Sequence, residues 1–483
     1  MLQKSEKLVI LHTNDIHSHF ERMPYIAKLL NQERQKAGQT ATLTVDCGDH
    51  IDRAYIETEG SMGIANVEVM NACSYDLVLP GNNEGLTLSP SFLAEAYRHA
   101  RFGIICANLF EADSGTPPEW MNPSRILVRG NLRIGVVGVT VAYIEFYRLL
   151  GWKVMDPIDA VRQQVGRIRD KVDLLIVLSH LGLPNDRLLA STVDGIDLIL
   201  GGHTHHLLEQ PLLESSTLIC GAGKFGTHIG RVEISYDLEL QQIIELKGTC
   251  IPTVDIEPDQ GIASLVEQFH EQSRLKLSRP ISQLAQPLGI HWESESPLGN
   301  LLAEGIRRHT GADIGLVNAG QILEGLEQGT VSLERLHQIC PSPINSCLYW
   351  LKGQDLLEAL ESALLLEYTS KPIYGYGFRG KILGILCLNG MEIEYHPEGP
   401  PNQKISRVMV GGELFNPEQE YLVGTIDMFV FGLGYPSLSR GRNVQFFSPY
   451  FLRELLADEL IRLQDRSQEE LIRHWVPTNT AYK

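Results

Sequence analysis

In the first half of the chain, short apolar runs are repeatedly followed by side chains of the kinds that bind metal ions. The runs at residues 8–11, 42–45, 77–79, 174–178 and 198–200 fit strands of a sheet that is covered on both faces. The side chains that follow them are Asp15, His17, Asp49, Asn82, His180, His203 and His205. Ligand sites of α/β sheets form at the carboxyl ends of strands, where loops from separate strands converge. The sequence therefore predicts that these residues share one site.

The donor types in this series indicate a metal centre. Carboxylate and amide oxygens mixed with imidazoles suit Mn²⁺, Fe²⁺, Zn²⁺ or Mg²⁺, and no thiolate is needed. In an extended chain Asp15 and His17 face the same way, and His203 and His205 repeat their spacing. An isolated Asp-x-His pair or a lone histidine is more often structural. The whole ordered set is what predicts metal binding.

The pattern along the chain predicts two α/β domains. Strand-like runs from residue 8 to residue 234 alternate with amphipathic stretches such as 24–35 and 156–170. Residues 262–277 fit one exposed helix between Pro258 and Pro280. We expect a first domain at residues 1–255, a linker helix at 256–280 and a second domain at 281–483. In the second domain we expect helices at 297–310 and 356–367, a strand at 314–317 and glycine-rich loops at 374–380 and 432–435.

Composition narrows the class of partner. The formal net charge of −18 argues against a nucleic-acid partner, because phosphate contacts need clustered Lys and Arg. No run of about 18 apolar residues is present for a membrane span, and the run at 8–11 is too short for the core of a signal peptide. The eight cysteines form no Cys-x-x-Cys pair. We expect a cytoplasmic protein without disulfides.

Five segments carry a resemblance to a known family. Residues 11–19, 46–49, 81–84, 179–180 and 201–205 read LHTNDIHSH, DCGD, GNNE, SH and GGHTH. They resemble the 5′-nucleotidase family of calcineurin-like metallophosphoesterases, and residues 298–301 and 317–320 resemble the substrate-domain motifs of that family. The resemblance implies a four-layer α/β/β/α metallophosphoesterase domain at the N-terminus. It also implies a C-terminal α/β substrate domain of the 5′-nucleotidase type.

The resemblance also implies how the site is assembled. One divalent ion would be held by Asp15, His17, Asp49 and His205, and a second by Asp49, Asn82, His180 and His203, with Asp49 bridging. Two such ions, drawn from Mn, Zn, Fe or Mg, polarise a phosphate and supply a hydroxide for in-line attack. The implied partner is a small phosphorylated substrate, such as a nucleotide, bound at the cleft between the two domains.

One departure from the family bears on catalysis. The histidine that follows the metal-binding Asn in the family is Asn83 here, and its usual carboxylate partner falls at Leu86. Loss of such an acid typically costs on the order of 10²–10⁴ in rate. His19 and His50 are candidate replacements by their position beside metal ligands, although both also fit supporting or loop roles. Alternatively, the enzyme favours phosphoanhydrides, whose leaving groups need little protonation.

The substrate contacts are the weaker part of the resemblance. The family's Asn-Gly-Gly-x-Arg segment lies at residues 318–323 but lacks its arginine. Candidate contacts for a base or phosphate are Arg53, Asn318, Gly320, Phe378, Arg379, Phe429, Phe431 and Tyr435. Core packing is an equal alternative for the aromatic residues. For Arg53 the alternative to a phosphate contact is a salt bridge with Asp52 or Glu57.

The function indicated is a metal-dependent phosphohydrolase of the 5′-nucleotidase class. Two alternatives use the same site on another substrate: a cyclic phosphodiesterase or a nucleotide-sugar hydrolase. A third is a metal- and ligand-binding protein with weakened catalysis. The absence of the His–Asp pair favours this third alternative, and the complete set of metal ligands opposes it, because buried carboxylates without a cation are costly.

Overall fold

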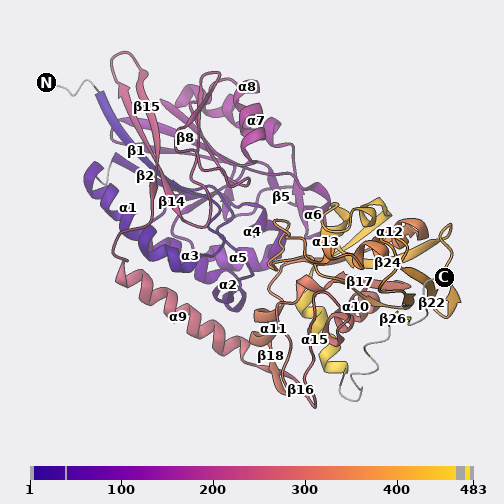
Figure 1. Ribbon diagram of the computed structural model, residues 1–483. Coiled ribbons are helices and arrows are strands. Elements are labelled where there is room, and N and C mark those ends of the chain that lie inside the picture. The colour runs from indigo at the N-terminus through magenta and orange to yellow at the C-terminus, as the bar shows by residue number, and fades with distance from the viewer. Residues whose placement is uncertain (1–4, 39–40, 464–470, 472–473, 479–483) are drawn as a thin grey trace. The chain divides into compact units, whose positions relative to one another are not determined.

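The computed structural model describes residues 5–38, 41–463, 471 and 474–478 (Figure 1). The chain divides into two compact units, residues 1–273 and 274–483. Helix α9 (Gln260–Leu277) occupies most of the segment predicted as a linker, and the division falls near its end.

Two mixed sheets form the first unit. The first sheet has the order β15-β14-β1-β2-β3-β4-β6, with β1, β2, β3, β4 and β6 parallel and the β14–β15 hairpin antiparallel at its edge. The second has the order β12-β13-β11-β10-β8-β7. The strands of the first are β1 (Ser5–Thr13), β2 (Thr42–Asp46), β3 (Leu77–Val78), β4 (Gly103–Ile105), β6 (Met121–Asn122), β14 (His228–Asp237) and β15 (Gln242–Pro252). Those of the second are β7 (Ser124–Arg129), β8 (Leu132–Thr140), β10 (Leu174–His180), β11 (Leu198–Gly201), β12 (Leu212–Glu214) and β13 (Thr217–Gly221).

Strand β10 shows why the runs are continuously apolar. Leu174, Ile176 and Leu178 join the main core with residues of the first sheet. Leu175 and Val177 point the other way, into a second core formed with α7 (Pro157–Ile168) and α8 (Leu183–Thr192). A strand buried on both faces has no polar face to alternate with.

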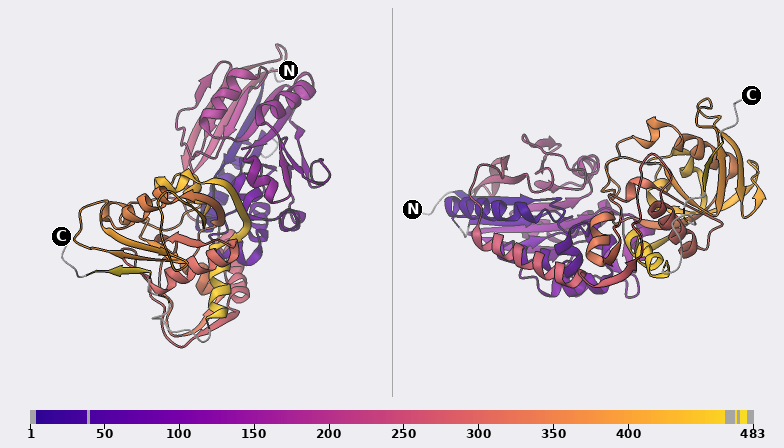
Figure 2. Two further views of the ribbon diagram at one scale, coloured as in Figure 1. Left: turned by 90° about the vertical axis from the view of Figure 1, so that its right-hand side faces the viewer. Right: turned by 60° about the horizontal axis from the view of Figure 1, so that its bottom comes forward.

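Helices cover both sheets of the first unit. Figures 1 and 2 show α7 and α8 beside the second sheet, and α1 (Met23–Ala37) and α3 (Ile64–Ala72) beside the first. Helices α2 (Ile56–Ser61), α4 (Asn82–Thr87), α5 (Pro90–Arg98) and α6 (Ile144–Leu149) lie in the segments that connect the strands. The predicted two-domain α/β class is confirmed.

The second unit has a sheet of order β20-β17-β24-β19-β25 and a smaller one of order β23-β22-β21-β26. Their strands are β17 (Ile314–Asn318), β19 (Asn345–Lys352), β20 (Leu386–Asn389), β21 (Met391–Tyr395), β22 (Ile405–Val410), β23 (Glu413–Leu414), β24 (Glu420–Ile426), β25 (Arg442–Phe451) and β26 (Trp475–Pro477). The strands of the larger sheet contact helices α10 (Pro297–Thr310), α12 (Gly353–Ala363) and α15 (Leu452–Arg462).

Most of the elements predicted for the second unit are present. The helix at 297–310 and the strand at 314–317 are found as α10 and β17, and the two glycine-rich loops are loops. The single helix predicted at 356–367 is wrong: α12 ends at Ala363, and the short α13 (Leu366–Thr369) follows a break. The smaller sheet was not predicted.

Two further expectations concern disulfide bonds and membrane-spanning helices. All eight cysteines are free thiols, and all except Cys250 are buried. Within the described ranges, no helix combines the length and apolarity that a bilayer crossing requires.

Candidate metal centre

Loops from five strands bring the predicted ligands together in the first unit. Asp15 and His17 follow β1, Asp49 follows β2, and Asn82 opens α4 after β3. His180 ends β10, and His203 and His205 follow β11. Backbone bonds tie the first two loops to each other: the Asp15 N–H donates to the Gly48 carbonyl at 2.9 Å and the His17 N–H to the Asp49 carbonyl at 2.8 Å.

The loop backbones are turned rather than extended. Asp15, His17, Asp49, His203 and His205 all have φ between 49° and 74°, in the left-handed region. The prediction that Asp15 and His17 face one way because the chain is extended there is therefore wrong. Left-handed backbone at non-glycine residues costs of order 1–3 kcal/mol each and gathers at functional sites.

Two groups of side chains have the spacing to hold a metal ion. They are Asp15 with His17 and His205, and Asp15 with Asp49 and His180. Asp15 Oδ1 lies 3.4 Å from His205 Nε2 and 4.0 Å from His180 Nε2. Asp49 Oδ1 lies 3.3 Å from His180 Nε2, and its Oδ2 lies 3.8 Å from His17 Nε2. Both carboxylates thus lie between histidines of the two groups, an arrangement that suits bridging.

Unpartnered buried atoms fit a cation at this place. In the part of the chain that the structure describes, His180 Nε2 and Asn82 Oδ1 are buried and make no hydrogen bond. His180 Nδ1 donates to the Cys47 carbonyl at 2.8 Å, so Nε2 is the nitrogen that faces Asp49, 3.3 Å from its Oδ1. Leaving such atoms unpaired costs about 1–3 kcal/mol each. The donor set fits divalent cations that take oxygen and imidazole ligands.

The electrostatics also call for positive charge. Burial lowers the pKa of His180, but the carboxylates of Asp49 and Asp15 outweigh burial and raise it to about 10. Burial likewise opposes charge on Asp49, yet His180 and His17 hold its pKa below the ordinary value. A divalent cation meets the same demand by replacing protons on the imidazoles.

His203 and Asn82 lie beside these groups. The ring of His203 packs edge-on against His180 at 5.2 Å, and its backbone N–H donates to both carboxylate oxygens of Asp15 at 3.0 and 3.1 Å. Its Nε2 lies 3.1 Å from the Tyr143 hydroxyl. Tyr143 was not predicted as a site residue, because its position shortly after the strand β8 is the one sequence feature that connects it to the site.

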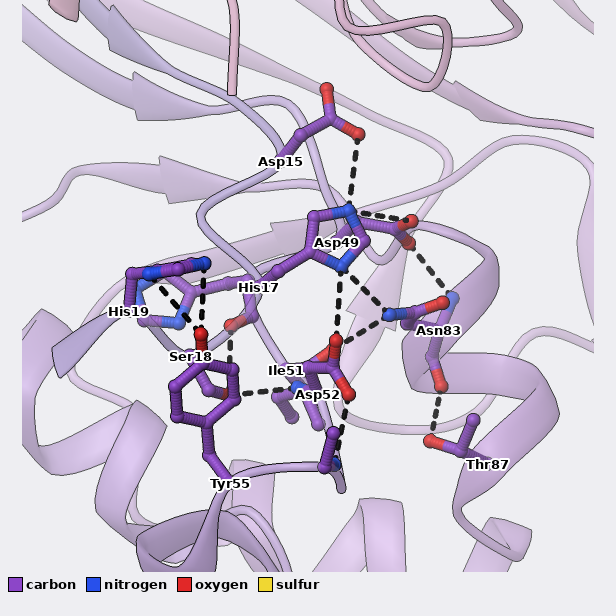
Figure 3. Close-up of polar contacts among 12 residues, drawn as sticks. Asp15, His17, Ser18, His19, Asp49, Ile51, Asp52, Tyr55, Asn83 and Thr87 are labelled. Atoms are coloured by element: carbon purple, nitrogen blue, oxygen red, sulfur yellow. Dashed lines mark hydrogen bonds and ion pairs between the residues drawn. The ribbon is translucent and has the colours of Figure 1, made fainter. Parts of the chain in front are cut away.

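The two candidate acids occupy different surroundings. His19, with 21% of its side chain exposed, bonds Glu21 through Nδ1 at 2.6 Å. Its Nε2 lies 2.8 Å from the Tyr55 hydroxyl (Figure 3). Its ring lies 4.2 Å from Phe225, which also contacts His17 and His205.

His50, by contrast, is buried. Burial lowers the pKa of His50 to about 3, so its ring is neutral at physiological pH. Of the two, the surroundings favour His19.

Arg53 is engaged elsewhere. Its guanidinium forms two hydrogen bonds to the carboxylate of Glu59, at 2.7 and 2.9 Å, and a third to the Thr87 carbonyl at 3.0 Å. The pair is a salt bridge of the kind expected as the alternative, with a partner other than Asp52 or Glu57. It does not favour a phosphate contact for Arg53.

The candidate contacts in the second unit divide into core and surface. Phe378, Phe429 and Tyr435 are buried in its hydrophobic core. Phe431 is 43% exposed and stacks on Tyr376, itself 59% exposed, with ring centroids 5.5 Å apart. Tyr376 was not among the predicted residues, although its glycine-rich loop was.

The other candidates of that unit, Asn318, Gly320 and Arg379, make contacts within the unit itself. The buried Asn318 donates from Nδ2 to the Leu383 carbonyl at 2.6 Å. Gly320 accepts no side chain, because an added Cβ would overlap the Ile382 carbonyl. The backbone N–H of Arg379 donates to Ser342 Oγ at 3.1 Å.

Metal binding has a measurable consequence for stability. We expect Mn²⁺ to raise the melting temperature of EDTA-treated protein in scanning calorimetry. An ion that binds only the folded state adds about 2.7 kcal/mol at a hundred times its Kd. The Asp49→Asn variant serves as the control and should show a much smaller rise. A wild-type melting temperature that stays constant over the whole Mn²⁺ range would contradict the metal centre.

Comparison with known proteins agrees with a metal centre in the first unit. Residues 8–207 match the family described as calcineurin-like phosphoesterase, and residues 281–439 match the 5′-nucleotidase C-terminal domain. The chain is 36% identical over 461 residues to the uncharacterized metallophosphoesterase YunD of Bacillus subtilis, covering 94% of this chain and 99% of that one. It is 25% identical over 419 residues to the 5′-nucleotidase of Homo sapiens, covering 74% and 72%.

A solved structure shares the fold over the full length. The putative 5′-nucleotidase of Staphylococcus aureus superposes with a TM-score of 0.69 at 18% identity, covering 98% of this chain and 100% of that one. Both matched domains and the relative at 36% identity show that the chain belongs to the calcineurin-like metallophosphoesterases that carry a 5′-nucleotidase C-terminal domain. It is a hydrolase of phosphoric esters.

Proposed function

We propose that the chain hydrolyses nucleotides or related phosphate esters and anhydrides at a two-metal centre in its first unit. The observation that carries the proposal is the convergence of Asp15, Asp49 and three histidines beside the unpartnered atoms of Asn82 and His180. A nucleotide as substrate is supported by the 5′-nucleotidase C-terminal domain and by the relatives that bear that name.

The residues present define what each part of the site would do. Asp15, His17, Asp49 and His205 would hold one ion, and Asp49, Asn82, His180 and His203 the other. When bound, such ions polarise the phosphate and lower the pKa of a bound water. The imidazole of His19, fixed between Glu21 and Tyr55, is the candidate to contact the leaving group.

The exposed pair Tyr376 and Phe431 is our candidate for binding the base. Both rings are partly exposed, and stacking of aromatic rings contributes about 0.5–1.5 kcal/mol beyond the burial of area. The arginine that family members use nearby is missing from residues 318–323. We propose a cytoplasmic location as well, on the ground that all eight thiols are free.

Substrate turnover tests the proposal. Phosphate or nucleotide release would be measured from AMP, ADP, UDP-glucose and a cyclic nucleotide, with Mn²⁺ added and again after EDTA treatment. We expect metal-dependent turnover, fastest on an anhydride. Absence of turnover on all four by protein that binds Mn²⁺ would contradict the proposal and favour a ligand-binding role.

The identity of residue 83 provides a sharper test of leaving-group chemistry. We expect Asn83→His to raise the ratio of AMP to UDP-glucose turnover at least about tenfold, because a protonated imidazole assists a poor leaving group far more than a good one. His19→Asn should lower the same ratio. An unchanged ratio in Asn83→His would contradict the explanation that a missing acid sets the substrate preference.

A further inference from the structure

The two ring nitrogens of His17 face different surroundings. Nε2 lies toward the metal side, 3.9 Å from Asp15 Oδ1 and 3.2 Å from His205 Nε2. Nδ1 lies on the opposite side of the ring, 3.0 Å from Asn83 Nδ2 and 3.5 Å from Asp52 Oδ2 (Figure 3). Neither Asp52 nor this use of Asn83 follows from the sequence.

The carboxylate of Asp52 is held firmly in place. Its side chain is 1% exposed. Oδ1 accepts the Ala54 backbone N–H at 2.9 Å, and the Asp52 N–H donates to Ser18 Oγ at 2.7 Å. Oδ2 lies 3.5 Å from His17 Nδ1. Burying a carboxylate costs free energy unless it is paired, and the imidazole of His17 is a partner that can offset this cost for Asp52.

The amide of Asn83 is fixed by its other neighbours. Oδ1 accepts from Asn82 Nδ2 at 3.2 Å, and Nδ2 donates to the Ile51 carbonyl at 3.2 Å. The group that Asn83 presents to His17 is therefore an N–H donor. Of the two neighbours of His17 Nδ1, only Asp52 offers an acceptor.

An imidazole that gives its Nε2 lone pair to a metal carries its proton on Nδ1, and that proton needs an acceptor. His180 already shows the arrangement, because its Nδ1 donates to the Cys47 carbonyl. Asp52 stands in the equivalent position for His17. Its negative charge also strengthens the imidazole as a ligand, in the manner of carboxylate–histidine–metal arrangements.

We propose that Asp52 is a positioning residue that fixes the ring and the metal-binding tautomer of His17 and so tightens the ion at Asp15, His17 and His205. The inference rests on the proposed two-metal centre. It gives this part of the site a use different from leaving-group protonation: Asp52 accepts the Nδ1 proton, and Asn83, whose N–H cannot bond to a protonated Nδ1, keeps its bond to the Ile51 carbonyl.

Equilibrium metal binding tests the proposal without reference to activity. Mn²⁺ affinity and stoichiometry would be measured by competition with a fluorescent chelator, and the spin coupling of the two ions by EPR. We expect Asp52→Asn to weaken one of two ions about 10- to 100-fold and to diminish the coupled signal. Asp52→Ala, which also removes the acceptor oxygen, should weaken that ion at least as much.

Asp427→Asn is the matched control. Asp427 is a partly buried carboxylate that accepts the backbone N–H of Asn345 in the second unit, and its loss should leave both Mn²⁺ affinities unchanged. Folding of each variant would be checked by circular dichroism without metal. Two ions bound with wild-type affinity by folded Asp52→Asn and Asp52→Ala would overturn the proposal. Failure of the wild type to bind two ions would instead count against the two-metal centre itself.

Discussion

Asp49→Asn should lower metal-dependent turnover by about 10³-fold or more. The carboxylate of Asp49 lies against histidines of both metal-binding groups, so its charge acts on both ions. The transition-state stabilisation that bound metals give is several kcal/mol, and about 4 kcal/mol corresponds to about 10³ in rate. The measurement is kcat/KM on the best substrate of the panel at saturating Mn²⁺.

Asp173→Asn is a suitable control for this change. Asp173 pairs with Arg133 at 3.1 Å on the surface of the same unit, and its loss should leave the rate within about twofold. The asparagine at position 49 keeps the shape of the side chain, so the fold should be retained. An Asp49→Asn enzyme with more than a tenth of wild-type kcat/KM would show that Asp49 is not a shared ligand.

Gly81→Ala should damage stability and metal binding together. A Cβ at Gly81 would overlap Oδ1 and the backbone nitrogen of Asp49, and a backbone atom cannot yield as a flexible side chain can. Forcing extra volume into such a contact costs about 3 kcal/mol. The displaced Asp49 would also lose its alignment with His180. The measurements are the free energy of unfolding in urea and the Mn²⁺ affinity.

Gly166→Ala isolates the steric part of that effect. Gly166 lies in α7 with nothing within 4 Å of an added Cβ, so alanine there should stabilise the protein by about 0.5–1 kcal/mol. Both changes add the same methyl group. If Gly81→Ala were as stable as the wild type and bound Mn²⁺ normally, close approach of the two loops would not be needed for the site.

Much of the fold was predictable because its signals are local. The apolar runs at residues 8–11, 42–45, 77–79, 174–178 and 198–200 coincide with strands β1, β2, β3, β10 and β11, and the helix predicted from Pro297 to Thr310 has those bounds in the structure. Strand and helix periods are properties of neighbouring residues, so they can be recognised in the sequence itself. The smaller sheet of the second unit was missed, since its strands are short, partly exposed and carry no continuous apolar run.

For the site, the sequence by itself determined which residue types stand at the ends of the strands. It therefore also determined that a cation that prefers oxygen and nitrogen ligands fits there. Only the tertiary structure decided which side chains face one another. It buried His50 but left His19 at Phe225, paired Arg53 with Glu59, and directed Asp52 at His17. These outcomes depend on contacts between segments distant in the chain, and no local pattern encodes which polar side chain is buried or which partner it meets across a loop.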